Sequence, residues 1–163
     1  MIFVTVGSQK FQFDRLIRAV DALVASGVAG DGAFAQTGVC TYIPEYLEHE
    51  AFLDRDSFRV HMDACDVVVT HGGTGAIIGA VKDNKKVIAV PRLAKYGEHV
   101  DDHQIEIVRQ FGVMGLIEPC MDPTDLPAAY ARVLSKDYLP YKSNAARFCA
   151  DLSDYIDGIG GVR

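Results

Sequence analysis

The chain has 163 residues, of which 49% are hydrophobic and 23% charged, with a net charge of −6 at pH 7. This composition is typical of a globular protein, and the length suits one domain spanning residues 1–163. The acidic balance argues against a general nucleic-acid binder, which needs a basic surface. No apolar run approaches the ~20 residues of a membrane span, and no signal peptide is recognisable, so we expect a soluble, cytoplasmic protein.

The four cysteines form no C-x-x-C pair, so neither a zinc knuckle nor a redox motif is visible. Cys65 and Cys149 lie among apolar residues and are expected as small core side chains.

The first half of the chain predicts a strand, a helix and a second strand. Residues 2–6 form a short β-branched run, and apolar residues recur at helical spacing from Phe13 to about Gly27. Residues 33–37 are a weaker strand candidate. Residues 40–59 are the least regular stretch, within which residues 42–46 suit either a strand or a loop.

The second half predicts strands at residues 66–70, 86–90 and, more weakly, 115–117. Helices are expected at residues 74–82, 102–111, 125–134 and 143–157. Apolar runs without polar alternation are typical of strands buried on both faces of a parallel sheet. The alternation of strands and helices therefore predicts an α/β fold, a single Rossmann-like domain with right-handed crossovers.

The strongest chemical signal follows the strand at 66–70, where the chain continues His71-Gly72-Gly73-Thr74-Gly75. Glycines let a backbone approach a ligand closely, and the free amides at the start of a helix attract an anion. A pyrophosphate suits this place, although a plain strand-to-helix turn has the same appearance. A Walker A loop is absent, and the dinucleotide fingerprint fails because Gly79 falls one residue late and no acid follows about 20 residues on.

The second signal is the polar run after the strand at 86–90. It contains seven candidate ligand contacts, which are Pro91, Arg92, Glu98, His99, Asp102, His103 and Gln104. Ligands of open α/β sheets bind at the carboxyl ends of strands, and sugar hydroxyls need such donors and acceptors. A solvated loop with a helix cap would look similar.

Two smaller features, the spacing of two histidines and the turn after the first strand, each have two interpretations. The spacing of His99 and His103 could hold a metal on a helix, but two ligands are too few, so no metal and no cofactor are expected. Gly7 and Ser8 follow the first strand and suit either a ligand contact or a plain turn.

With these motifs the chain resembles the donor-binding half of GT-B glycosyltransferases of the MurG type, with a family 28 C-terminal-like domain. It is most similar to the small, PssE/EpsF-like subunit of two-component bacterial exopolysaccharide and capsule glycosyltransferases. The resemblance covers nearly the whole chain and is most specific at residues 96–104, Tyr-Gly-Glu-His-Val-Asp-Asp-His-Gln.

The resemblance implies roles for individual residues. The segment 71–75 would lie at the donor's diphosphate, Pro91 and Arg92 would flank the nucleotide, and His103 and Gln104 would contact sugar hydroxyls. MurG-type enzymes carry a ribose-binding glutamate where this chain has Gly79. The ribose contact then falls to another residue, for which Glu98 is the candidate.

The resemblance also implies a UDP-sugar-binding subunit of a bipartite hexosyltransferase. A membrane-anchored partner subunit would bind a lipid-linked saccharide acceptor and supply the catalytic base, leaving this chain peripheral at the inner face of the membrane. The alternatives are a non-catalytic enhancer subunit and a Rossmann oxidoreductase. The helix at 143–157 places Ala145, Phe148, Cys149, Leu152 and Ile156 on one side, and this side would face either the chain's own domain or the partner.

Overall fold

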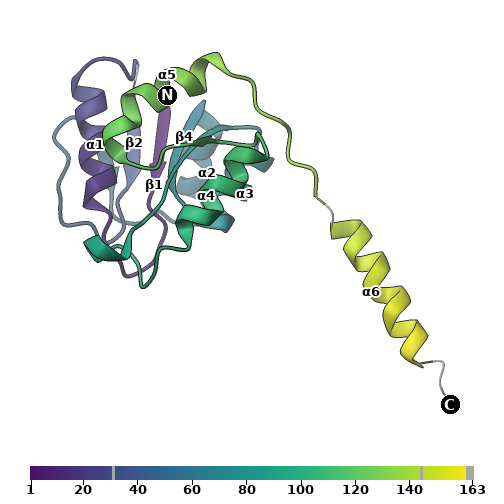
Figure 1. The fold of residues 1–163 in the computed structure, drawn as a ribbon. Coiled ribbons are helices and arrows are strands. Elements are labelled where there is room, and N and C mark those ends of the chain that lie inside the picture. The colour runs from purple at the N-terminus through teal and green to yellow at the C-terminus, as the bar shows by residue number, and fades with distance from the viewer. Residues whose placement is uncertain (31, 144, 161–163) are drawn as a thin grey trace.

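The computed structural model describes residues 1–30, 32–143 and 145–160. Six parallel strands form one sheet in the order β3-β2-β1-β4-β5-β6, with helices on both faces (Figure 1). The elements are, in chain order, β1 (Ile2–Thr5), α1 (Asp14–Ala25), β2 (Ala33–Gln36), β3 (Glu48–Glu50), α2 (Arg55–Ala64), β4 (Val67–His71), α3 (Thr74–Lys82), β5 (Lys86–Val90), the 3-10 helix η1 (Ala94–Tyr96), α4 (Gln104–Val113), β6 (Glu118–Pro119), the 3-10 helix η2 (Pro123–Asp125), α5 (Leu126–Ser135) and α6 (Ala145–Gly160). The predicted Rossmann-like α/β architecture is confirmed.

The core consists of two layers, one on each face of the sheet. Strand β4 shows how they are built, because Val67 and Val69 pack in the layer with α1 and α5. Val68 points the other way and packs with residues of α2, α3 and α4. Successive side chains of a strand alternate between faces, so a fully apolar strand serves both layers.

The order of the strands creates one switch point. From β1 the chain adds β2 and β3 on one side, and then returns to add β4, β5 and β6 on the other. Strands β1 and β4 are neighbours, in register from Ile2 beside Val67 to Thr5 beside Thr70. In open α/β sheets, ligands bind outside the carboxyl ends of the strands at such a point.

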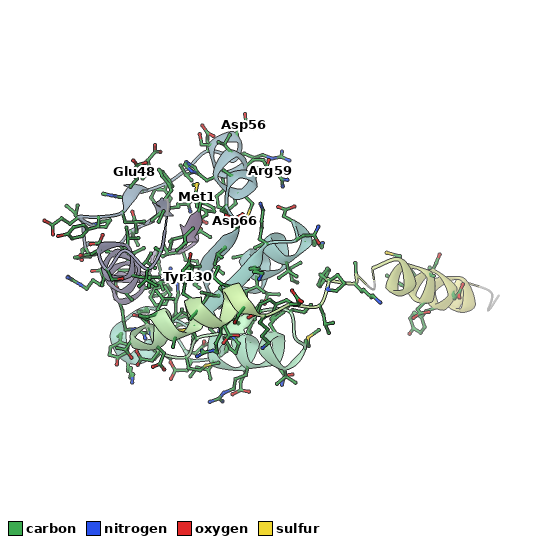
Figure 2. All side chains as sticks on the ribbon, turned by 90° about the horizontal axis from the view of Figure 1, so that it is seen from above. Met1, Glu48, Asp56, Arg59, Asp66 and Tyr130 are labelled. Carbon is green, nitrogen blue, oxygen red and sulfur yellow. The ribbon has the colours of Figure 1, made fainter. Side chains whose placement is uncertain are left out.

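The opposite, amino-terminal edge of these two strands is closed by the start of the chain. The amino group of Met1 lies 2.8 Å from the carboxylate of Asp66, and both residues are labelled in Figure 2. The carbonyl of Met1 also accepts the backbone N–H of Asp66. This edge is therefore held by contacts within the chain.

Two predicted features differ from the structure. Residues 115–117 are not a strand, because Gly115 has a positive φ of 70° and ends α4, and the strand forms later as β6. The irregular stretch 40–59 contains β3 and the start of α2, which the analysis missed. Strand β3 is only three exposed residues and shows no apolar alternation, whereas α2 had a usable signal in its cap, Asp54, which accepts the N–H of Ser57.

Residues 42–46 form a loop, and Asp21 of α1 determines its path. The buried Asp21 carboxylate accepts hydrogen bonds from the Tyr42 hydroxyl and from the backbone N–H groups of Glu45 and Tyr46. Burial alone would raise the pKa of Asp21, but these hydrogen bonds outweigh it and hold the pKa below its usual value.

Helix α6 lies apart from the sheet at the end of an extended segment (Figure 1). Its side chains Leu152 and Ile156 are 45% and 56% exposed. Cys149 is also exposed, so its expected place in the core is wrong, whereas Cys65 is buried as predicted. None of the described helices is both long and apolar enough to cross a bilayer.

We predict that Asp21→Ala lowers the free energy of unfolding by about 2 kcal/mol, because hydrogen bonds to a buried charge are lost. The contribution of Asp21 is present above its unfolded pKa and disappears as the pH falls through its lower folded pKa. Urea unfolding at pH 7 and pH 3 measures both effects. Glu45→Gln is the control, since its exposed side chain lies in the same loop; an equal loss in this variant would contradict the assignment.

Candidate functional site

The loops after β1 and β4 meet at the carboxyl edge of the sheet and enclose one imidazole. A Cβ added at Gly7 would lie 2.8 Å from Cε1 of His71, and a Cβ at Gly73 would collide with Nε2 of the same ring. Gly7 also has a φ of 76°, which disfavours other residues. These two glycines therefore make room for His71 and bring the two loops together.

The remaining glycines of the motif differ in their surroundings. A Cβ at Gly72 would lie 2.9 Å from side-chain atoms of Gln104 and Val108, so Gly72 allows α4 to pack closely. A Cβ at Gly75 or Gly79 would meet nothing within 4 Å. Gly75 and Gly79 thus leave open space beside α3, where a ligand can approach the backbone.

This open space belongs to a cavity of about 460 Å³ between the β1 loop, α2 and α3. Its lining includes Gly7, Ser8, Gly75, Gly79 and Gln36, and aromatic side chains of the α2 region that the sequence analysis missed, Phe52 and Phe58. Phe52 follows β3 and Phe58 lies in α2, so neither could be assigned to the site before those elements were known.

The amino end of α3 lies at this cavity. Thr74 is its first residue, and the preceding Gly73 supplies no side-chain cap. The first N–H groups of a helix have no partner within the helix, and together with the helix dipole they favour a bound anion. The cavity therefore combines an apolar wall with an anion-binding helix end.

His71 is neutral in this environment. Burial, and next the nearby charge of Arg92, lower the pKa of His71 to about 4. The ring is held between Gly7 and Gly73 and adds no positive charge at neutral pH. It is a packing element of the site and not a cationic ligand for phosphate.

Arg92 is a structural residue. It is 1% exposed, and its guanidinium donates hydrogen bonds to the backbone carbonyls of four residues, Val6, Phe11, Gln12 and Glu98. With Nη1 and Nη2 engaged in this way, Arg92 holds the loop after β1 against the loop after β5. The resemblance implied that Arg92 flanks the nucleotide, and in the structure both Nη atoms of Arg92 bind backbone carbonyls of the chain itself.

Glu98 and its neighbours also form part of the loop. The Glu98 carboxylate pairs with Arg15 at 2.9 Å and accepts the N–H of Leu93, and it is 1% exposed. Both carboxylate oxygens of Glu98 therefore have hydrogen-bond partners within the chain. The carbonyl of Pro91 accepts a further bond from Arg15, an α1 residue that the sequence analysis did not single out.

Gln104 joins the two sequence motifs. Its Oε1 accepts the backbone N–H of Gly72 and of Arg92, both at 3.1 Å, and the residue is buried. Asp102 is exposed and caps η1 by accepting the N–H of Ala94. The predicted sugar contacts at Asp102 and Gln104 therefore have structural partners within the chain.

His99 and His103 lie together at the same edge, with ring centroids 4.8 Å apart. They do not share a helix, because His103 is the residue before α4. Asp101, which the sequence analysis did not select, contacts both imidazoles. His103 remains half-exposed and free to contact a ligand on its outer side.

A second hollow, of about 510 Å³, lies on the other face of the sheet between α1, η1 and the start of α5. It is lined by Arg15, Arg18 and Tyr96, among others, and includes none of the glycines of the loop. The first cavity is the stronger candidate because it contains the uncapped end of α3.

We predict that His71 makes the domain less stable in mild acid. Its folded pKa of about 4 lies below the unfolded value of 6.5, so only the unfolded chain takes up the proton between these limits. Stability then falls by about 2 kcal/mol from pH 7 to pH 5. His71→Asn should remove this part of the pH dependence in urea unfolding, while His49→Asn should retain it. An unchanged pH dependence in His71→Asn would show that folding does not lower the pKa of His71.

Comparisons with known proteins agree with the fold. The human UDP-N-acetylglucosamine transferase subunit ALG13 is 27% identical over 128 residues, which are 73% of this chain and 11% of that protein. The solved glycosyltransferase of kitacinnamycin superposes with a TM-score of 0.60 at 18% identity, covering 83% of this chain and 35% of that one. The chain thus spans only a minor part of both relatives. Residues 1–157 match the model of the glycosyltransferase family 28 C-terminal domain, and the chain therefore belongs to that family.

Proposed function

We propose that this chain is the UDP-sugar-binding subunit of a bipartite glycosyltransferase. The observation that carries the proposal is the cavity at the carboxyl edge, where Gly75 and Gly79 leave free space beside the uncapped start of α3. The diphosphate would lie at the α3 amino end, and the nucleoside against Phe52 and Phe58. The volume of about 460 Å³ is within the range of small-molecule sites.

This chain would contribute to the reaction by electrostatic stabilisation of the leaving group. Backbone N–H groups at the start of α3 stabilise the negative charge that develops on the departing UDP. The rigid frame around Arg92, Gln104 and Gly72 keeps those donors in place. Family membership favours a glycosyltransferase over the oxidoreductase alternative, and no cofactor is required by the proposal.

The second half of the enzyme is proposed to lie on another chain. A membrane-anchored subunit would bind the lipid-linked saccharide acceptor and provide the base, in exopolysaccharide or capsule synthesis of the PssE/EpsF type. The similarity to a protein named as a transferase subunit supports a divided enzyme. Helix α6 would offer the contact, because Cys149, Leu152 and Ile156 of its apolar side are exposed.

Binding of UDP in the cavity can be tested by substitutions that fill the cavity with a larger side chain. Gly79→Leu should abolish UDP binding in calorimetry, because the new side chain enters the free space beside α3. The same change should leave the melting temperature equal or higher, since replacing a helical glycine is worth about 0.5–1 kcal/mol. The Gly75→Val variant should also fail to bind UDP.

Ala22→Leu is the matched control, because Ala22 is an exposed helical residue in the second hollow. Unchanged UDP affinity in a folded Gly79→Leu variant would remove the nucleotide from this cavity. A chain that pairs with a partner but never binds UDP would instead be the enhancer subunit. Gly73→Val is unsuitable, since it would displace His71 and destabilise the domain.

The second test concerns assembly. Ending the chain after Lys142 should leave the melting temperature within about 2 °C, because Leu152 and Ile156 do not pack on the domain. The truncated chain should no longer co-purify with the co-expressed membrane subunit, and sugar transfer by membranes should be lost. Leu152→Glu should act like the truncation, whereas Asp154→Ala, on the opposite side of α6, should not. A folded truncated chain that still binds the subunit would place the interface elsewhere.

A further inference from the structure

A compact group of three side chains lies between η1 and α4. His99, Asp101 and His103 each bring one possible metal-binding atom to within 4.8 Å of the others. The sequence offered only two imidazoles, which are too few for a metal site. The loop conformation adds a carboxylate and so completes a set of two nitrogens and one oxygen.

The contacts within this group cannot all be satisfied by hydrogen bonds. Nδ1 of His99 lies 3.3 Å from the backbone N–H of Asp101, which donates to it, so this contact requires a lone pair on Nδ1. The same Nδ1 lies 3.1 Å from Oδ1 of Asp101, which also offers lone pairs when ionised. Either protonation state of Nδ1 leaves one of these two contacts unmet.

Oδ1 of Asp101 faces Nδ1 of both imidazoles. A cation between Nδ1 of His99 and Oδ1 of Asp101 would replace the contact between their lone pairs by two metal–ligand bonds. The Nδ1 lone pair would then no longer accept the backbone N–H of Asp101.

The surroundings also suit a bound ion. The side chain of His99 is only 9% exposed and packs against the ring of Phe11, which limits its rotation. Asp101 and His103 are about half-exposed, so one side of the group is open to solvent. Zinc sites of this kind use three protein ligands at about 2.0–2.2 Å and keep a position for water or another oxygen ligand.

We propose that His99, Asp101 and His103 bind one divalent transition-metal ion, with zinc as the ion that two imidazoles and a carboxylate suit best. The site stands on these three residues and is independent of the proposed function. The cluster lies in the loop between β5 and α4, at the carboxyl edge of the sheet.

The test uses the full chain carrying Cys149→Ser, which removes an exposed thiol that would also bind zinc. After treatment with a chelator, the protein is titrated with Co²⁺, followed by visible absorption, and with Zn²⁺, followed by calorimetry. We expect one saturable site per chain for each ion. Asp101→Asn and His103→Asn should raise the Kd for Zn²⁺ more than about tenfold.

Both substituted side chains are about half-exposed, so these variants should keep the melting temperature of the parent. His49→Asn is the matched control and should bind metal normally, because His49 lies in β3 outside the cluster. Failure to saturate, or equal affinity in all the variants, would overturn the proposal and leave the cluster as an ion pair only.

Discussion

The buried guanidinium of Arg92 is the interaction on which the carboxyl edge of the sheet depends. It donates to carbonyls of the loop after β1 and to Glu98 of the loop after β5, while its own N–H bonds to Gln104. Burying a charge costs free energy unless the charge is hydrogen-bonded. Removing one of its partners would therefore destabilise the folded domain. The conformations of both loops therefore depend on Arg92.

The hydrogen bonds around Arg92 explain why many polar residues of the run at 91–104 have partners within the chain. Glu98 pairs with Arg15, Asp102 caps η1, and Gln104 joins Gly72 to Arg92. A loop that carries a ligand site needs its backbone groups satisfied even without the ligand. Most of these side chains hold the loops in place, and the cavity beside α3 is lined in large part by glycine and aromatic residues.

The amino-terminal and carboxyl edges of the sheet differ in the features that they carry. The amino-terminal edge is closed by the pairing of Met1 with Asp66, and the carboxyl edge carries the cavity and the His99–Asp101–His103 cluster. Helix α6 lies away from both core layers and exposes apolar side chains. Such a helix contributes little to the stability of the domain and gains stability only by packing against another surface.

The sequence by itself determined the parallel α/β fold, because the apolar runs of β1, β4 and β5 can be buried only between two layers of helices. It also placed the glycine and polar runs in loops at the carboxyl edge of the sheet, since these runs follow β4 and β5 directly. It could not place β3, which is three exposed residues without apolar alternation, and it missed α2 although the cap Asp54 marks its start. Nor could it separate Gly73, which makes room for His71, from Gly75, which faces open space. Only the tertiary structure decided these roles, because identical residues differ solely in what lies opposite them, and that is set by contacts between segments far apart in the chain.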